Sequence, residues 1–115
     1  MKAIDFLKQG ETAIVFFTDG RNLIIRSNGT GTSGNWIINP KRRADKIIIY
    51  RRDTTDIQIT NEIFIGHHNG VTGPIPDDDR RYIVAFINLR SCGTTDMNWS
   101  EFAETGSAPV RYLKR

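Results

Sequence analysis

Short runs of β-branched and aromatic residues, bounded by glycine, proline, asparagine or aspartate, recur along the whole of this chain. Such runs are typical of β-strands, and their close spacing is typical of a small sheet or barrel. Apolar residues at helical spacing predict two short helices instead, at Ala3–Lys8 and Met97–Thr105. The strands are predicted at Ala13–Phe17, Asn22–Arg26, Trp36–Ile38, Lys46–Arg52, Ile57–His68, Arg81–Leu89 and Val110–Leu113.

These elements predict an α+β domain, with a small, strongly curved, barrel-like sheet of six or seven strands and two short helices. Asp19-Gly20 is a strong turn signal, so Ala13–Arg26 is predicted to be a β-hairpin. Two connections are predicted to be exposed loops, Ser27–Gly34 and Asn69–Asp79. A chain of 115 residues has room for one hydrophobic core, so residues 1–115 are predicted to form a single domain.

Positive charge is concentrated in the middle of the chain. The formal net charge of the whole chain is +3, from 16 Lys and Arg against 13 Asp and Glu. Six of these cations and only two acids fall within Asn35–Asp53, so the rest of the chain is close to neutral. A local excess of this kind attracts anionic partners such as phosphate groups. The six cations are Lys41, Arg42, Arg43, Lys46, Arg51 and Arg52.

Two aromatic residues, Trp36 and Tyr50, accompany these cations, and the combination suits nucleotides. Arginine and lysine hold phosphates by charge, while an aromatic ring stacks on a planar base. An alternative stays open, in which both rings are core and the basic run is a solvated turn paired with Asp45 and Asp53. We predict ligand-binding roles for Trp36, Tyr50 and Arg51, and phosphate-binding roles for Lys41, Arg42, Arg43, Lys46 and Arg52. Trp99, beside Phe102, is predicted to be core.

Three other patterns suggest chemistry but lack the partners that it needs. His67 and His68 are neighbours on a predicted strand and so point to opposite faces, which argues against a shared metal. The triple Asp77–Asp79 suits a solvated acidic loop better than a Mg²⁺ site. Cys92 is the only cysteine, and although a Cys-His pair stays open, it is expected to be inert. We predict no catalytic residue, no metal and no cofactor, and we do not expect an enzyme.

The segment Gly29–Gly34 matches the G-x-G-x-x-G spacing of dinucleotide-binding loops. That chemistry needs a helix to begin at the loop, whereas a strand and Pro40 follow here. The segment is therefore predicted to be a flexible connection, with a mobile flap over a ligand as the alternative. No stretch of the chain approaches the ~18 to 20 apolar residues that cross a bilayer, and no secretion signal is evident. We expect a cytoplasmic protein with no membrane partner.

Three segments, Ala44–Arg51, Glu62–Gly66 and Arg81–Phe86, together resemble the core of PUA-like domains, the superfamily that includes the EVE and ASCH families. The resemblance covers roughly Asn35–Arg90 and lies in the order and spacing of the strands. It implies a pseudo-barrel with a concave pocket, in which relatives bind RNA or a flipped, modified base between aromatic walls. By position, Trp36, Tyr50 and Arg51 would lie near that pocket. The ASCH signature G-x-K-x-x-E-x-R is absent, so no catalytic or RNA-contact residue is carried over.

The function predicted from the sequence is therefore that of a nucleic-acid or nucleotide-binding domain, with a base in an aromatic pocket beside a basic patch. Two alternatives remain. The first is a protein that sequesters or senses small nucleotides. The second is a homo-oligomeric assembly protein without a nucleotide ligand, in which the basic strand pairs with the Pro76–Asp79 loop of another copy.

Overall fold

The computed structural model describes residues 1–53 and 60–115, and its main feature is one mixed sheet of seven strands. Their order across the sheet is β2-β3-β6-β5-β4-β1-β7, and neighbouring strands are antiparallel except β1 and β4, which are parallel. The strands are β1 (Thr12–Thr18), β2 (Leu23–Ile25), β3 (Gly31–Ile37), β4 (Lys46–Asp53), β5 (Thr60–Thr72), β6 (Arg81–Thr95) and β7 (Val110–Lys114).

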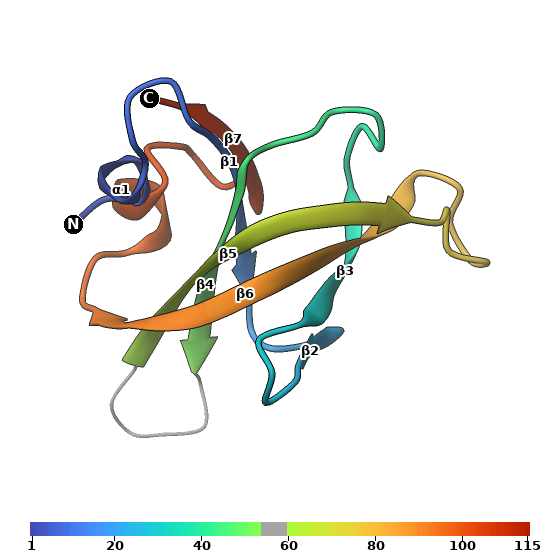
Figure 1. Ribbon diagram of the computed structural model, residues 1–115, viewed down its shortest axis with the longest axis horizontal. Coiled ribbons are helices and arrows are strands. Elements are labelled where there is room, and N and C mark those ends of the chain that lie inside the picture. The colour runs from blue at the N-terminus through green and yellow to red at the C-terminus, as the bar shows by residue number, and fades with distance from the viewer. Residues whose placement is uncertain (54–59) are drawn as a thin grey trace.

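The long strands β5 and β6 join the two halves of the molecule. The first half of β5 pairs with β4, while the first half of β6 pairs with β3. Three register shifts interrupt the β5–β6 pairing, and bulges of this kind bend and twist a sheet. The sheet therefore curls back on itself. In Figure 1, β2 and β3 lie on one side of β1 and β4, and the short helical turns lie on the other.

Strands β1 and β4 are buried on both faces, which gives the molecule two cores. Successive side chains of a strand point to opposite faces, so Val15 and Phe16 enter different cores. Burial on both sides also explains the unbroken Ile47–Ile49 run, which is fully buried. The helix-side core contains Ala3, Leu7, Ala13, Val15, Ile48, Tyr50, Ile63, Ile65, Trp99, Phe102, Ala103 and Leu113. The β3-side core contains Ile14, Phe16, Ile47, Ile49, Val84 and Phe86, with Trp36 packed against it.

The predicted number of strands is confirmed, but the predicted hairpin at Ala13–Arg26 is wrong. β1 pairs with β4 and β7, while β2 pairs with β3. The turn residues Asp19 and Gly20 do follow β1, but both edges of β1 are already occupied by strands that bury it. The chain therefore continues past β1 before β2 finds a partner. The first three residues of the predicted strand Ile57–His68 lie outside the described residues.

The predicted loops are shorter than expected. Ser27–Gly34 was predicted to be a loop, yet β3 begins at Gly31 and β5 continues to Thr72. A Cβ atom on Gly31 would overlap the carbonyl oxygen of Ile24 and lie 2.8 Å from the Phe86 ring. Glycine is therefore needed there for close packing of β2 and β3 over the core, and this residue belongs to a strand rather than a flap.

The predicted barrel is not confirmed, and the two predicted helices are shorter than expected. Helix is limited, among the described residues, to a 3-10 turn, η1 (Ala3–Phe6), and one α-helical turn, α1 (Trp99–Phe102). The outermost strands β2 and β7 do not pair with each other, so the sheet stays open. Among the described residues, no helix has the length and apolar character needed to cross a membrane.

Candidate functional site

A hollow of about 720 Å³ opens where β1, β4 and β5 meet the segment around α1. We call it the aromatic hollow, because the rings of Phe17, Tyr50 and Trp99 form one wall. The polar wall comes from different parts of the chain, so the hollow exists only in the folded protein. Its other lining residues are Arg52, Asn61, Asp96, Asn98, Ser100, Gly106 and Ser107.

The register of the sheet brings the three rings together. Phe17 is opposite Tyr50 in the β1–β4 pair, and their rings stack with centroids 5.6 Å apart at 27°. The Trp99 ring lies 5.5 Å from the Phe17 ring and 5.7 Å from the Tyr50 ring. Tyr50 is 2% exposed and Trp99 is 9% exposed, whereas Phe17 is only half-buried. Phe17 therefore offers most of the ring surface that a ligand can still reach.

Hydrogen bonds hold the two polar rings in place. The Tyr50 hydroxyl donates to the carbonyl oxygen of Met97 at 2.7 Å, and the Trp99 indole N–H donates to that of Ala108 at 2.8 Å. Asn98 caps α1, since its Oδ1 accepts from the Glu101 amide at 2.9 Å. Burial raises the pKa of Tyr50, and the nearby positive charge of Arg52 acts in the opposite direction. The ring wall is thus fixed before any ligand arrives.

Asn61 supplies the most distinctive polar group in the hollow. It is 7% exposed, and its Oδ1 has no hydrogen-bond partner in the part of the chain that the structure describes. A buried acceptor left unpaired costs about 1–3 kcal/mol, which a ligand N–H would recover. Arg52 stands opposite Asn61 in the β4–β5 register and is exposed. Asn61 and Arg52 are therefore neighbours in the lining of the hollow.

The structure does not bring Trp36 and Tyr50 to one cavity. Trp36 stacks on Phe16 with centroids 4.9 Å apart at 18°, and its indole N–H donates to Ser33 Oγ at 2.9 Å. Phe16 and Phe17 are successive residues of β1 and face opposite sides, so Trp36 and Tyr50 lie on opposite sides of the sheet. Among the described residues, Tyr50 therefore lines the aromatic hollow, whereas Trp36 lines a different groove.

Arg51 is also separated from Tyr50. As the next residue of β4, it points to the opposite face, and its Nε lies 3.4 Å from the position that a Cβ on Gly20 would occupy. That nitrogen is buried without a hydrogen-bond partner among residues 1–53 and 60–115. Of the three predicted ligand-binding residues, only Tyr50 lines the aromatic hollow.

The predicted phosphate-binding cations fall into three separate places. Lys41, Arg42 and Arg43 belong to the loop before β4, where the Arg42 guanidinium lies 3.9 Å from the centroid of the Tyr112 ring. Lys46, at the start of β4, contacts Glu11 at 3.7 Å and His67 Nε2 at 3.0 Å. Arg52, which lines the hollow, is six residues further along the strand, or about 20 Å away.

The histidine, aspartate and cysteine side chains singled out in the sequence lie in different surroundings. Burial lowers the pKa of His68, and the positive charge of Arg43 adds to this effect. Hydrogen bonds from Arg80 hold the pKa of Asp78 at about 2. Cys92 packs against the helix-side core, with its sulfur 3.8 Å from an Arg90 nitrogen. Within residues 1–53 and 60–115 no three His, Cys, Asp or Glu side chains are grouped to hold a metal ion.

Sequence reasoning missed Phe17, Asn61 and Trp99 as lining residues. The apolar run Ala13–Phe17 shows no alternation, so nothing in it distinguishes a ring at a hollow from a ring in a core. Trp99 was assigned to the core, and it is indeed buried, but one edge lines the hollow. Asn61 is a polar residue inside a predicted strand, which is a weak signal because many strands are half exposed.

Comparison with known proteins adds no functional information: no protein-family model, curated protein or solved structure matches this chain. The functional argument therefore depends on the geometry of the aromatic hollow.

Proposed function

We propose that this chain binds a nucleotide, either free or as part of a nucleic acid, in the aromatic hollow. The proposal is supported by one observation above all. Aromatic rings, a guanidinium group and a buried amide oxygen without a hydrogen-bond partner among the described residues line the same hollow. Phe17 would stack on the base, Asn61 Oδ1 would accept a hydrogen bond from a base N–H, and Arg52 would pair with a phosphate.

The size and the rigidity of the hollow fit this ligand class. Its volume of about 720 Å³ lies within the roughly 300–1,000 Å³ range of small-molecule sites. The Tyr50 and Trp99 rings are already fixed by hydrogen bonds, so binding costs little ordering of the wall. Stacking of one base on an aromatic ring is worth about 1–3 kcal/mol.

The distribution of cations favours a short ligand over a long strand. Arg52, near the end of β4, is the arginine that lines the hollow. The loop carrying Lys41, Arg42 and Arg43 lies before the start of β4, far from the hollow. Arg111 adds a second exposed cation near the hollow, because it is opposite Val15, two residues before Phe17 and on the same face. This arrangement supports the alternative in which the protein sequesters or senses free nucleotides.

The resemblance to PUA-like domains remains part of the proposal, since relatives use a concave pocket to hold a base. In this chain we propose that the rings of the aromatic hollow, rather than Trp36, hold the base. We do not extend the proposal to assembly through the Pro76–Asp79 loop. Asp78 is engaged by Arg80 and Arg81 of its own chain, at 3.1 and 3.2 Å.

The proposal is tested by calorimetric titration with the four ribonucleoside monophosphates and with a short single-stranded oligonucleotide. The wild-type protein should bind at least one mononucleotide, and Arg52→Ala should weaken that binding about tenfold, because a charge-assisted hydrogen bond is lost. Arg26→Ala is the matched control, since Arg26 is an exposed arginine outside the hollow and should be silent.

The two ligands distinguish the two sources of the nucleotide. Binding of the oligonucleotide alone, weakened by Arg42→Ala with Arg43→Ala, would assign the site to nucleic acid. If a mononucleotide binds as strongly as the oligonucleotide, the site would be assigned to free nucleotides. Absence of binding to both ligands, or equal weakening by Arg52→Ala and Arg26→Ala, contradicts the proposal.

A further inference from the structure

The curled sheet brings the end of β3 close to β7 without pairing the two strands. Between them lies a groove of about 250 Å³ that draws its lining from both sides. A second hollow, of about 370 Å³, shares Trp36 and Arg81 with this groove and continues it to Phe17. We call the groove the seam; it is lined by Trp36, Ile37, Arg81, Ala108, Pro109 and Val110.

The outer edge of β7 is paired with no other strand among the described residues. The carbonyl oxygen of Pro109 accepts from the Phe17 amide at 2.9 Å, and the Arg115 amide donates to the carbonyl oxygen of Glu11 at 3.0 Å. In an antiparallel pair, every second residue of a strand forms hydrogen bonds with the partner strand. These two contacts and the register show that the odd-numbered residues of β7 form hydrogen bonds with β1. The peptide groups of Val110, Tyr112 and Lys114 therefore point away from β1, along the outer edge of β7, and Val110 lines the seam.

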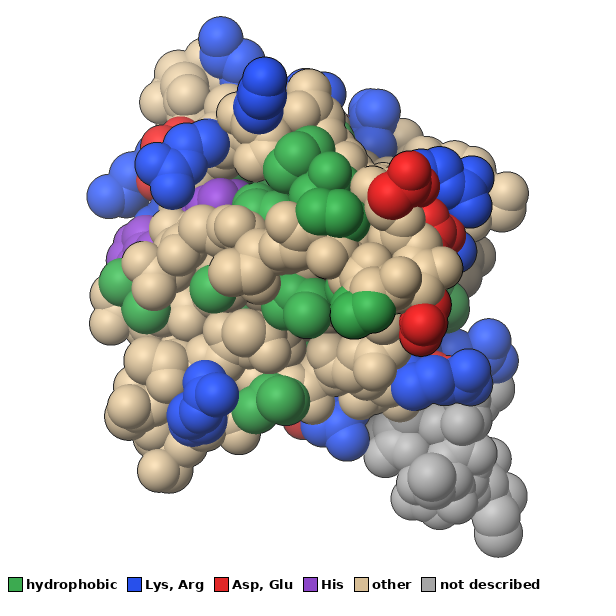
Figure 2. Space-filling model, turned by 90° about the vertical axis from the view of Figure 1, so that its right-hand side faces the viewer, with side chains coloured by type: hydrophobic (Ala, Val, Ile, Leu, Met, Phe, Trp, Pro, Cys, Tyr) green, Lys and Arg blue, Asp and Glu red, His purple; other side chains and the backbone are tan. Residues whose placement is uncertain are grey.

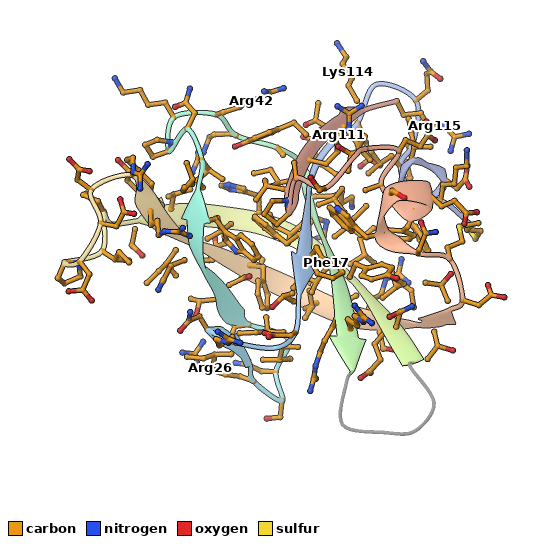
Figure 3. The ribbon with its side chains drawn as sticks, turned by 180° about the vertical axis from the view of Figure 1, so that it is seen from behind. Phe17, Arg26, Arg42, Arg111, Lys114 and Arg115 are labelled. Atoms are coloured by element: carbon orange, nitrogen blue, oxygen red, sulfur yellow. The ribbon has the colours of Figure 1, made fainter. Side chains whose placement is uncertain are left out.

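The side chains along the seam change from apolar to cationic. At the level of Val110, the apolar surface of Trp36 and of Ile37, which is 53% exposed, lines the groove. Two and four residues further along β7, Tyr112 lies under the Arg42 guanidinium and Lys114 is exposed. Figure 3 shows Arg42, Arg111, Lys114 and Arg115 gathered at this end of the molecule, away from Arg26.

We propose that the seam binds an extended acidic segment of a partner protein, which adds to β7 as a further strand. Strand addition supplies affinity through main-chain hydrogen bonds and specificity through alternate side chains. An apolar side chain of the segment enters the groove beside Val110. Acidic side chains further along face Arg42 and Lys114 on one side of the strand and Arg111 on the other. The recognised pattern is therefore one apolar residue followed by acidic residues.

Charge complementarity selects this occupant over two others. A second copy that added its own β7 would bring Arg111, Lys114 and Arg115 close to the same three cations, and like charges on paired strands repel. A nucleic acid would satisfy the cations but leaves the outward peptide groups and the apolar groove unused. The proposal does not depend on nucleotide binding. Phe17 borders both the aromatic hollow and the second hollow, but the seam itself shares no lining residue with the aromatic hollow.

The test uses the capped peptide Leu-Glu-Glu-Thr-Glu and the same peptide in reverse order, followed by NMR of the full chain. One of the two orders should bind and slow amide hydrogen exchange at Val110, Tyr112 and Lys114 about tenfold, because these amides become hydrogen-bonded. A peptide with lysine in place of glutamate should not bind.

Two variants locate the interaction. Val110→Pro removes an outward N–H that β1 does not use, and edge strands tolerate proline, so the fold should persist while peptide binding falls about tenfold. Lys114→Glu should also weaken binding about tenfold by charge reversal, whereas the matched control Arg26→Glu should have no effect. The charge-reversal pair decides the matter if the proline variant does not fold.

Several outcomes overturn the proposal. Failure of both glutamate peptides to bind is one, and equal binding of the lysine peptide is another. Equal effects of Lys114→Glu and Arg26→Glu would show that the seam is not the site. Self-association of the chain that Val110→Pro abolishes would assign the seam to a second copy, and protection of the three amides by an oligonucleotide instead of the peptide would assign it to nucleic acid.

Discussion

Phe16 and Phe17 are neighbours on β1, yet they belong to two regions with different chemistry. Phe16 is fully buried under Trp36, whose indole N–H donates to Ser33, so the Phe16 ring has no surface free for a ligand. Phe17 is half-buried at the aromatic hollow, which Asn61 also lines; the Oδ1 of Asn61 has no partner within residues 1–53 and 60–115. The comparison teaches that an aromatic residue is available for binding only under two conditions. Packing must leave part of its ring exposed, and a polar neighbour must lack a hydrogen-bond partner.

Exposed hydrophobic side chains are also present on the surface of the molecule. Figure 2 shows hydrophobic side chains gathered in the middle of one face, with cations at its margins. The largest exposed apolar side chains include those of Ile24 and Ile37, at 52% and 53%. Single exposed aliphatic residues are common on soluble domains, so only Ile37, which lines the seam, enters our proposals.

The strongest test of the comparison is truncation of Phe16. Phe16→Ala removes a fully buried ring and the surface on which Trp36 stacks, so the free energy of unfolding should fall by about 3–5 kcal/mol. Urea denaturation measures this loss. Phe17→Ala is the matched control on the same strand and should cost clearly less stability. Equal losses would contradict the difference in packing that we describe.

Phe17→Ala should act mainly on binding. The variant removes the accessible ring of the hollow, so nucleotide affinity should fall by about 1–3 kcal/mol, as measured by calorimetry. Phe17→Tyr keeps a ring of the same size and should retain most of the affinity. Unchanged binding by Phe17→Ala would place the ligand elsewhere.

Tyr50→Phe probes the fixed wall of the hollow. Loss of the hydroxyl leaves the Met97 carbonyl without its donor, which should cost about 1 kcal/mol of stability at neutral pH. Because burial raises the pKa of Tyr50 above 10, the wild-type protein should lose stability as pH rises beyond 10, when the unfolded chain ionises first.

Chemical denaturation between pH 8 and pH 11 checks this prediction. Tyr50→Phe should show a shallower decline than wild type. Tyr112, whose pKa is also raised by burial, keeps its own contribution in both proteins, so the decline should not vanish. An identical slope in the two proteins would show that the Tyr50 hydroxyl ionises as freely in the folded state as in the unfolded chain.

The smallest effect is expected at His68, on the seam side of the sheet. Its pKa is lowered by burial and by Arg43, so stability is fully present above the unfolded value near 6.5 and declines as pH falls below it. His68→Gln should reduce that decline between pH 7 and pH 5. Arg43→Ala should raise the pKa of His68 towards 6.5, which NMR titration can follow, and an unchanged pKa would remove Arg43 as a cause.

Most strands could be predicted from the sequence, because β-branched runs and turn residues are local signals. Their pairing could not. The Asp19-Gly20 turn predicted a hairpin, whereas β1 is covered on both edges by β4 and β7, which come from residues 46–53 and 110–114. The sequence predicts a loop at Gly31. Its close contact with Ile24 and Phe86, which only the fold shows, explains why a strand residue must be glycine there.

Two of the residues singled out in the sequence lie in the candidate site. Tyr50 and Arg52 do line one hollow, as an aromatic and a cation from the same strand. Trp36 is on the opposite face because the side that a residue occupies depends on strand pairing, which composition does not encode. Asn61 and Trp99 come from 9 and 47 residues beyond Arg52, a separation that only the fold closes.

The most direct test of the central claim uses the two tryptophans, which lie on opposite sides of the sheet. Trp36→Phe leaves Trp99 as the fluorescent reporter at the hollow, and Trp99→Phe leaves Trp36. On titration with the mononucleotide that binds best, the emission of Trp99 should be quenched while that of Trp36 stays constant. Quenching of Trp36 alone, or equal quenching of both, would contradict a nucleotide site in the aromatic hollow.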